Sequence, residues 1–187
     1  MSTIFLIHGS FGKPFENWLP WMETKLSEEK FRCFAPHFPT PEGQNYPNWC
    51  KLLDYYRDLN LINENTIFVG HSSGAIFTAR YIADHRLRVK AYISVAGFNQ
   101  FLSGDATFDN INKSFFTDQE NLHRLVELAA KRYCFISDND PYLPVDKLNE
   151  FASCIEAEKF VVAGGGHFNS AAGYDKFEQL LGLIKTV

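Results

Sequence analysis

A serine flanked by glycines is the residue whose surroundings most clearly suggest chemistry. Ser72 stands at the centre of GHSSG at 70–74, directly after the apolar run Ile67–Val69 and before a helix-period pattern. A sharp strand-to-helix turn accepts only small residues two positions to either side of its centre, which accounts for both glycines. Such a turn strains its central residue and presents the hydroxyl to solvent. We therefore predict that Ser72 is a nucleophile. The alternative is that Ser72 or Ser73 only caps the helix.

A nucleophilic serine needs a general base, and the base needs an acid that orients it. His167 follows a strand-like run and three glycines at 164–166, which is where a base carried by a loop would lie. Asp140, before Pro141, is our first choice for the acid, and Asp138 is the alternative. Each of these residues could instead be structural, as a loop histidine or as an aspartate that forms a turn.

Acyl transfer also needs hydrogen-bond donors for the oxyanion that develops on the carbonyl. The residue after the nucleophile supplies one backbone N–H, here that of Ser73. The loop after the first strand begins His8-Gly9-Ser10, and we expect the second N–H from Ser10, or else from Phe11. The other interpretation is an ordinary glycine-rich turn. His8 is expected to shape this turn, and His71 to turn its ring away from the nucleophile.

Composition limits the possible partners. The chain has 187 residues, a formal net charge of −4 and no long Lys or Arg run, which argues against nucleic acid and anionic membranes as partners. Its apolar runs are too short to span a bilayer, and the N-terminus shows no signal-peptide pattern. The four cysteines form no Cys-x-x-Cys pair, so free thiols and a cytoplasmic location are expected. No motif indicates a metal or a cofactor, so none is expected.

The elements that must position these residues alternate between strand and helix. Strands are expected at 4–7, 32–35, 67–69, 91–95, 133–136 and 160–163. Helices are expected at 15–29, around 49–56, after Ser72, and around 122–129, 148–155 and 177–184. The stretch 98–117 has no period and should fold over the strand ends, either as a small lid or as a surface loop.

This alternation predicts one α/β domain over residues 1–187 with a mostly parallel sheet. Ligands bind outside the carboxyl ends of the strands in such sheets. Ser72, Asp140 and His167 each follow an expected strand, so all three should meet at one edge. Their order along the chain is that of the α/β hydrolases.

The sequence resembles the small serine hydrolases related to retinoblastoma-binding protein nine. The resemblance covers nearly the whole chain. It is most specific at GHSSGA with the following Ala79-Arg80-Tyr81, at SDNDPYLP over 137–144, and at GHF over 166–168, with Trp18 and Trp21 matching a tryptophan pair of the first helix. It implies an α/β-hydrolase fold of about six strands in the order 2-1-3-4-5-6, flanked by helices, with little or no cap. It also implies a triad of Ser72, Asp140 and His167.

We therefore expect a serine hydrolase that cleaves a small-molecule ester, thioester or amide, as a monomer or weak homodimer. One alternative is a binding or scaffold protein that keeps the fold with little turnover. Another is lyase or perhydrolase chemistry on the same triad.

Overall fold

The computed structural model describes residues 2–101 and 106–187, and it contains one six-stranded sheet. The spatial order is β2-β1-β3-β4-β5-β6, and every neighbouring pair is parallel. This order and direction confirm the prediction. The strands are β1 (Thr3–Ile7), β2 (Arg32–Phe34), β3 (Thr66–His71), β4 (Val89–Val95), β5 (Ala129–Ser137) and β6 (Glu158–Val162).

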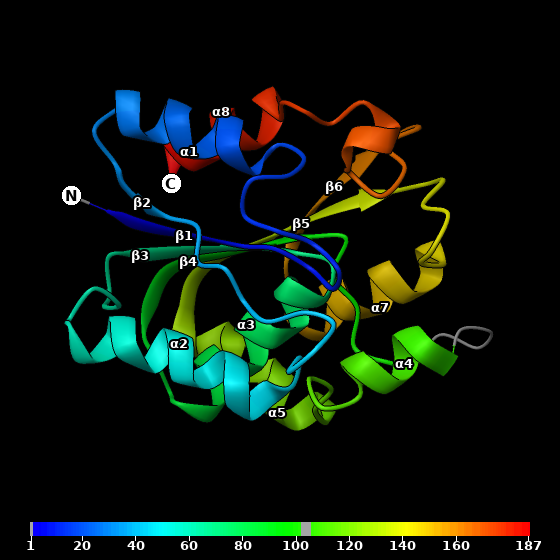
Figure 1. Ribbon diagram of the computed structural model, residues 1–187, viewed down its shortest axis with the longest axis horizontal. Coiled ribbons are helices and arrows are strands. Elements are labelled where there is room, and N and C mark those ends of the chain that lie inside the picture. The colour runs from blue at the N-terminus through cyan, green and yellow to red at the C-terminus, as the bar shows by residue number, and fades with distance from the viewer. Residues whose placement is uncertain (1, 102–105) are drawn as a thin grey trace.

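Helices cover both faces of this sheet (Figure 1). Helices α1 (Leu19–Glu28) and α8 (Glu178–Thr186) lie together on one face, and α2 (Tyr46–Asp58) and α3 (Ser73–Asp84) lie on the other. The remaining helices are α4 (Ala106–Asn112), α5 (Gln119–His123), α6 (Leu125–Leu128) and α7 (Val145–Cys154). Within the described ranges, no helix is long and apolar enough to cross a bilayer.

The central strands are apolar because both of their faces are covered. Every residue of β1 and β3 is buried, which explains why these segments are continuous apolar runs without alternation. Helix α3 packs on β3 and is buried over most of its length, including its first residues. The nucleophile candidate therefore sits at a buried junction between a strand and a helix.

Three local predictions differ from the structure. The first helix was expected from residue 15 but begins at Leu19, after Asn17 adopts a φ of 53° that cannot continue a helix. Helix α4 lies in the stretch 98–117, where no period is visible; residues 102–105 of that stretch are outside the described ranges. Ala129 was assigned to a helix but begins β5, because it pairs with Val89 of β4.

The parallel strands deliver the expected site segments to one edge of the sheet. The loop 8–12 follows β1, Ser72 follows β3, Asp140 lies beyond β5 and His167 lies beyond β6. Helix α4 lies beside the same edge (Figure 1). The architecture thus places a hydroxyl, a carboxylate and an imidazole where parallel α/β proteins bind ligands.

Candidate active site

Ser72 is the single residue between β3 and α3. Its φ of 55° and ψ of −125° are unusual for a residue with a side chain, as expected of a nucleophile elbow. Its backbone N–H donates to the Val95 carbonyl at 2.8 Å, which holds the turn against β4. A Cβ on Gly70 would lie 2.5 Å from the Ala75 Cα, so only glycine allows the chain to double back here.

The loop after β1 passes directly over this serine. A Cβ added to Gly9 would lie 2.9 Å from the Ser72 Cβ and 3.3 Å from its Oγ. His8 shapes the turn as expected: its Nδ1 donates to the Gly9 carbonyl at 2.8 Å, and its Nε2 accepts the Phe38 N–H at 3.0 Å. Both ring nitrogens are used in this neutral form, and burial lowers the pKa of His8.

Asp140 and His167 form a hydrogen-bonded pair that is partly buried. The Nδ1 of His167 lies 2.8 Å from the Asp140 Oδ2, and the exposed fractions of the two side chains are 12% and 0%. The other oxygen, Asp140 Oδ1, accepts the backbone N–H groups of Tyr142 at 2.9 Å and Leu143 at 3.1 Å. The carboxylate is thus satisfied on both oxygens and can hold the His167 proton on Nδ1. That tautomer leaves Nε2 as the acceptor that a general base requires.

Asp138 and Asn139, in the same turn as Asp140, bind the loop that carries His167. Asp138 Oδ1 accepts the Gly164 N–H at 2.8 Å, and Asn139 Oδ1 accepts the Gly166 N–H at 2.8 Å. The structure therefore brings Asp140, and not Asp138, to the imidazole. Asn139 was not singled out in the sequence, because a turn asparagine looks the same whether or not it supports a neighbouring loop.

Two side chains on the other side of the loop hold its carbonyls. His71 Nε2 donates to the backbone oxygen of His167 at 2.8 Å, and Trp18 Nε1 donates to that of Phe168 at 3.0 Å. Burial lowers the pKa of His71 to about 3, and the nearby His167 adds to the effect, so His71 is a neutral donor at pH 7. The ring centroids of His71 and His167 are 4.9 Å apart. The His71 ring thus helps to fix the backbone of the loop that carries His167.

The expected oxyanion donors differ in their surroundings. Ser73 begins α3, where a backbone N–H has no partner within the helix. The Ser10 N–H instead donates to the Ser73 Oγ at 2.6 Å, and the Phe11 N–H donates to the Thr40 Oγ1 at 2.8 Å. The two candidate donors of the loop, the N–H groups of Ser10 and Phe11, therefore already have protein partners, which the sequence did not suggest. Gln44 and Asn112 also join this hydrogen-bonded group, and neither belongs to a motif.

Ser72 and His167 line one cavity of about 570 Å³. Much of its wall is apolar, with Phe11, Leu19, Phe108 and Tyr142 contributing side chains. Phe108 belongs to α4, so the stretch that was expected to fold over the strand ends does form part of the wall. The cavity is large enough for a small organic molecule.

Other reactive groups are less suited to chemistry. The four cysteines are free thiols, and burial raises the pKa of Cys134 to about 12 and of Cys50 to about 11. A thiol with such a pKa is a poor nucleophile at pH 7. Among the described residues, no group of three or more His, Cys, Asp or Glu side chains is arranged to hold a metal ion.

Comparison with known proteins identifies the family of the chain. The family described as serine hydrolase matches residues 4–186. The putative hydrolase YdeN of Bacillus subtilis is 26% identical over 173 residues, or 91% of this chain and 88% of YdeN. The rat (Rattus norvegicus) serine hydrolase RBBP9 is 26% identical over 171 residues, covering 91% of this chain and 86% of RBBP9.

The fold is likewise similar to a solved structure. The crystal structure of the ydeN gene product of B. subtilis superimposes with a TM-score of 0.86 over 100% of this chain and 98% of the other, at 23% identity. The resemblance that the motifs indicated is confirmed, as is the α/β-hydrolase fold.

Proposed function

The chain belongs to the serine hydrolase family, and we propose that it hydrolyses a small-molecule ester, thioester or amide through a triad of Ser72, His167 and Asp140. The observation that carries this proposal is the 2.8 Å bond between His167 Nδ1 and the buried Asp140 carboxylate, beside the cavity that Ser72 lines. These are the three groups that an activated serine requires.

The roles follow from the tautomer of the histidine. With its proton held on Nδ1 by Asp140, the His167 ring accepts the Ser72 proton at Nε2 as Oγ attacks the carbonyl carbon. Asp140 stabilises the imidazolium that results. The ring then gives this proton to the leaving group, which departs and leaves an acyl group on Ser72. Water, activated by the same ring, attacks the acyl-enzyme and releases the acid.

The oxyanion of the tetrahedral intermediate needs two donors. The Ser73 N–H at the start of α3 is one, and the positive end of the helix dipole adds to it. The Ser10 N–H is the second, because it lies on the loop that crosses Ser72. It presently donates to the Ser73 hydroxyl. An oxyanion carries full negative charge and is a stronger acceptor than a hydroxyl, so it displaces that bond as charge develops.

Hydrolysis of p-nitrophenyl esters of increasing acyl length tests this function. The wild-type protein should release p-nitrophenol, and the acyl length that gives the highest kcat/KM reports the space in the cavity. Ser72→Ala should reduce kcat by several powers of ten while the protein stays folded. Equal rates for the two proteins, or no turnover of any ester, thioester or amide, would refute the proposal and favour a binding role.

A further inference from the structure

Asn112 is a buried polar residue that the triad does not use. It is the last residue of α4, and its exposed fraction is 0%. Its Oδ1 accepts the Ser10 hydroxyl at 2.9 Å and the Gln44 Nε2 at 3.1 Å, and its Nδ2 donates to the Phe108 carbonyl at 2.9 Å. A buried amide with each polar atom satisfied is a fixed group, because any displacement leaves an unpaired donor or acceptor.

Asn112 and Gln44 both bind the side chain of Ser10, whose backbone N–H is the proposed oxyanion donor. Gln44 Nε2 donates to the Ser10 Oγ at 2.7 Å, and the Ser10 and Ser73 hydroxyl oxygens are 2.8 Å apart. We call Ser10, Gln44, Ser73 and Asn112 the polar clamp. If Ser73 donates to Ser10 and Ser10 donates to Asn112, each of the two hydroxyl protons has one acceptor, and the Ser73 oxygen is free to accept the Ser10 N–H.

The polar clamp joins four separate parts of the chain. Ser10 lies on the loop after β1, Gln44 precedes α2, Ser73 begins α3 and Asn112 ends α4. The 8–12 loop also bonds internally from the Gly12 N–H to the Gly9 carbonyl, and the Phe11 N–H donates to the Thr40 Oγ1, but the bonds of Ser10 itself run to the other members of the clamp. The position of the Ser10 N–H therefore depends on the side chains that grip this residue.

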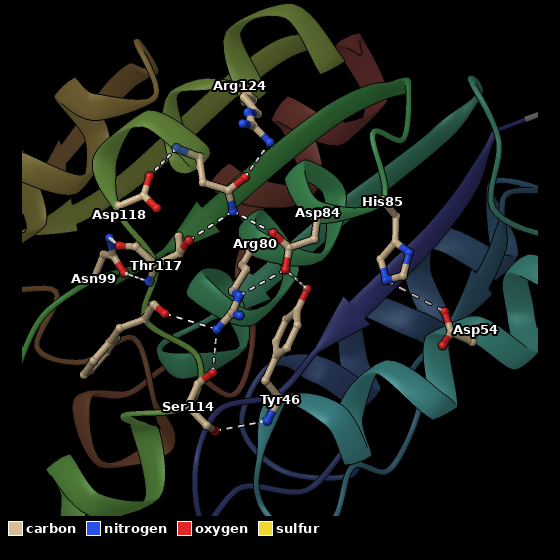
Figure 2. Close-up of polar contacts among 12 residues, drawn as sticks. Tyr46, Asp54, Arg80, Asp84, His85, Asn99, Ser114, Thr117, Asp118 and Arg124 are labelled. Carbon is tan, nitrogen blue, oxygen red and sulfur yellow. Dashed lines mark hydrogen bonds and ion pairs between the residues drawn. The ribbon is translucent and has the colours of Figure 1, made fainter.

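Helix α4 is followed directly by a segment that is bound to α3, which supports the Asn112 end of the helix. Just beyond its end, Arg80 donates to the carbonyls of Ser114 at 2.7 Å and Phe116 at 3.1 Å (Figure 2). Asp84 holds Arg80 at 3.1 Å. Figure 2 also shows Asn99 and Thr117 bonded to each other, and both of their bonds join the Asn99 side chain to the Thr117 backbone.

The carboxylate of Asp84 is the centre of this support. It also accepts the Tyr46 hydroxyl at 2.7 Å and the Asn121 amide at 2.7 Å. Burial acts to raise its pKa, but the bonds from Tyr46, Asn121 and Arg80 outweigh burial and the pKa is lowered. Asp84 is therefore ionised at neutral pH, and the Arg80 guanidinium, which also lies 3.9 Å from the Tyr46 ring centroid, stays fixed.

We propose that Asn112 and Gln44 are positioning residues for oxyanion stabilisation: by gripping the Ser10 side chain they hold the backbone at Ser10 in place, so that its N–H can pass from the Ser73 Oγ to the oxyanion. Helix α4 is then part of the catalytic apparatus as well as a wall of the cavity. The inference rests on the proposed hydrolase function. It adds two residues from outside the family's motifs, and it predicts an effect on the transition state more than on substrate binding.

The test uses Asn112→Leu and Gln44→Met, which keep the approximate side-chain size and remove the bonds to Ser10. Steady-state kinetics on the best p-nitrophenyl ester should show kcat lowered about 10- to 100-fold in each, with KM within about threefold, because loss of one complete oxyanion donor costs about 10²–10³ in kcat. The Ki of a trifluoromethyl ketone, which forms a tetrahedral oxyanion on the serine, should rise by the same factor as kcat/KM falls.

The control is Thr66→Val, which removes a fully buried hydroxyl, the acceptor of the Asn63 N–H, at the start of β3 and so at the end of that strand away from Ser72. It should keep kcat within about threefold. An equal loss in this variant would overturn the proposal, since the effect would then come from loosened packing. The proposal would also be overturned if a folded clamp variant kept the wild-type kcat and Ki, or if the variants changed KM alone.

Failure of the hydrolase function is a distinct outcome. It would appear in the wild-type protein as no turnover and no inhibition by the ketone.

The two clamp variants also provide an internal check. Because they grip the same Ser10 hydroxyl, their effects on kcat should be far from additive in the double variant. Full additivity would mean that the two residues act through different groups and would overturn the assignment.

Discussion

Replacement of Asp140 by asparagine is the sharpest probe of the acid. The two Asp140 oxygens have different partners: Oδ1 accepts the N–H groups of Tyr142 and Leu143, and Oδ2 faces His167 Nδ1. In Asp140→Asn, the amide oxygen must stay on the side of the two N–H donors, because an NH₂ group there would face them. The NH₂ group is thereby turned towards His167.

That orientation reverses the tautomer of the imidazole. An NH₂ donor facing Nδ1 makes Nδ1 an acceptor, so the proton moves to Nε2 and the ring can no longer take the Ser72 proton. A base held in the wrong tautomer loses about 10⁴ in kcat at neutral pH, which corresponds to about 5.5 kcal/mol of transition-state stabilisation. The side-chain shape is unchanged, so the free energy of unfolding should change little by comparison.

The assay is ester hydrolysis at pH 7.5, with Asp138→Asn as the matched control. The Asp138 Oδ1 accepts the Gly164 N–H, and the amide oxygen of an asparagine can accept the same bond. We expect the control to lose less than about tenfold in kcat. If Asp138→Asn were the severe variant and Asp140→Asn the mild one, the acid would have to be reassigned to Asp138 and the argument from hydrogen-bond partners would be wrong.

Three further predictions concern the frame around the triad. Gly70→Ala should lower the free energy of unfolding by about 3 kcal/mol, since its Cβ would lie 2.5 Å from the Ala75 Cα; Gly182→Ala in α8, where a Cβ meets nothing within 4 Å, should raise it by about 0.5–1 kcal/mol in denaturant titrations. His71 has its pKa lowered to about 3, so the unfolded chain takes up a proton near pH 6.5 while the folded chain does not. The free energy of unfolding should therefore fall by about 2 kcal/mol more between pH 7 and pH 5 in the wild type than in His71→Gln, and equal slopes would contradict the assignment. Iodoacetamide at pH 7.5 should leave kcat within about twofold, because burial raises the pKa of Cys134 to about 12 and that of Cys33 to about 12; rapid inactivation in step with alkylation would point to a thiol in the reaction.

The sheet could be predicted from the sequence because each central strand is a continuous apolar run. A run of apolar residues without alternation indicates a strand that is buried on both faces, and β1 and β3 are buried at every position. The candidate triad could be placed for a related reason. Ser72 directly follows β3, while Asp140 and His167 lie in the loops that follow β5 and β6, and parallel strands bring such positions to one edge.

The parts that could not be predicted depend on contacts between distant segments. Helix α4 has seven residues and no apolar period; what holds it are bonds from other elements, such as that of Asn112 to Ser10. Likewise, Ala129 reads as helical in its local pattern, but pairing with β4 makes it the start of a strand. The occupied N–H of Ser10 was invisible because its partner is 63 positions away.

The most direct test of the account is labelling with a fluorophosphonate probe, followed by mass spectrometry of the digested protein. The elbow geometry, with His167 lining the same cavity, predicts one adduct per chain, on the peptide that contains Ser72 and on that side chain. Ser72→Ala should abolish the adduct, and His167→Ala should slow its formation by several powers of ten. A folded wild-type protein that remains unlabelled, or that carries the adduct on another residue, would contradict the central claim that Ser72 is the nucleophile.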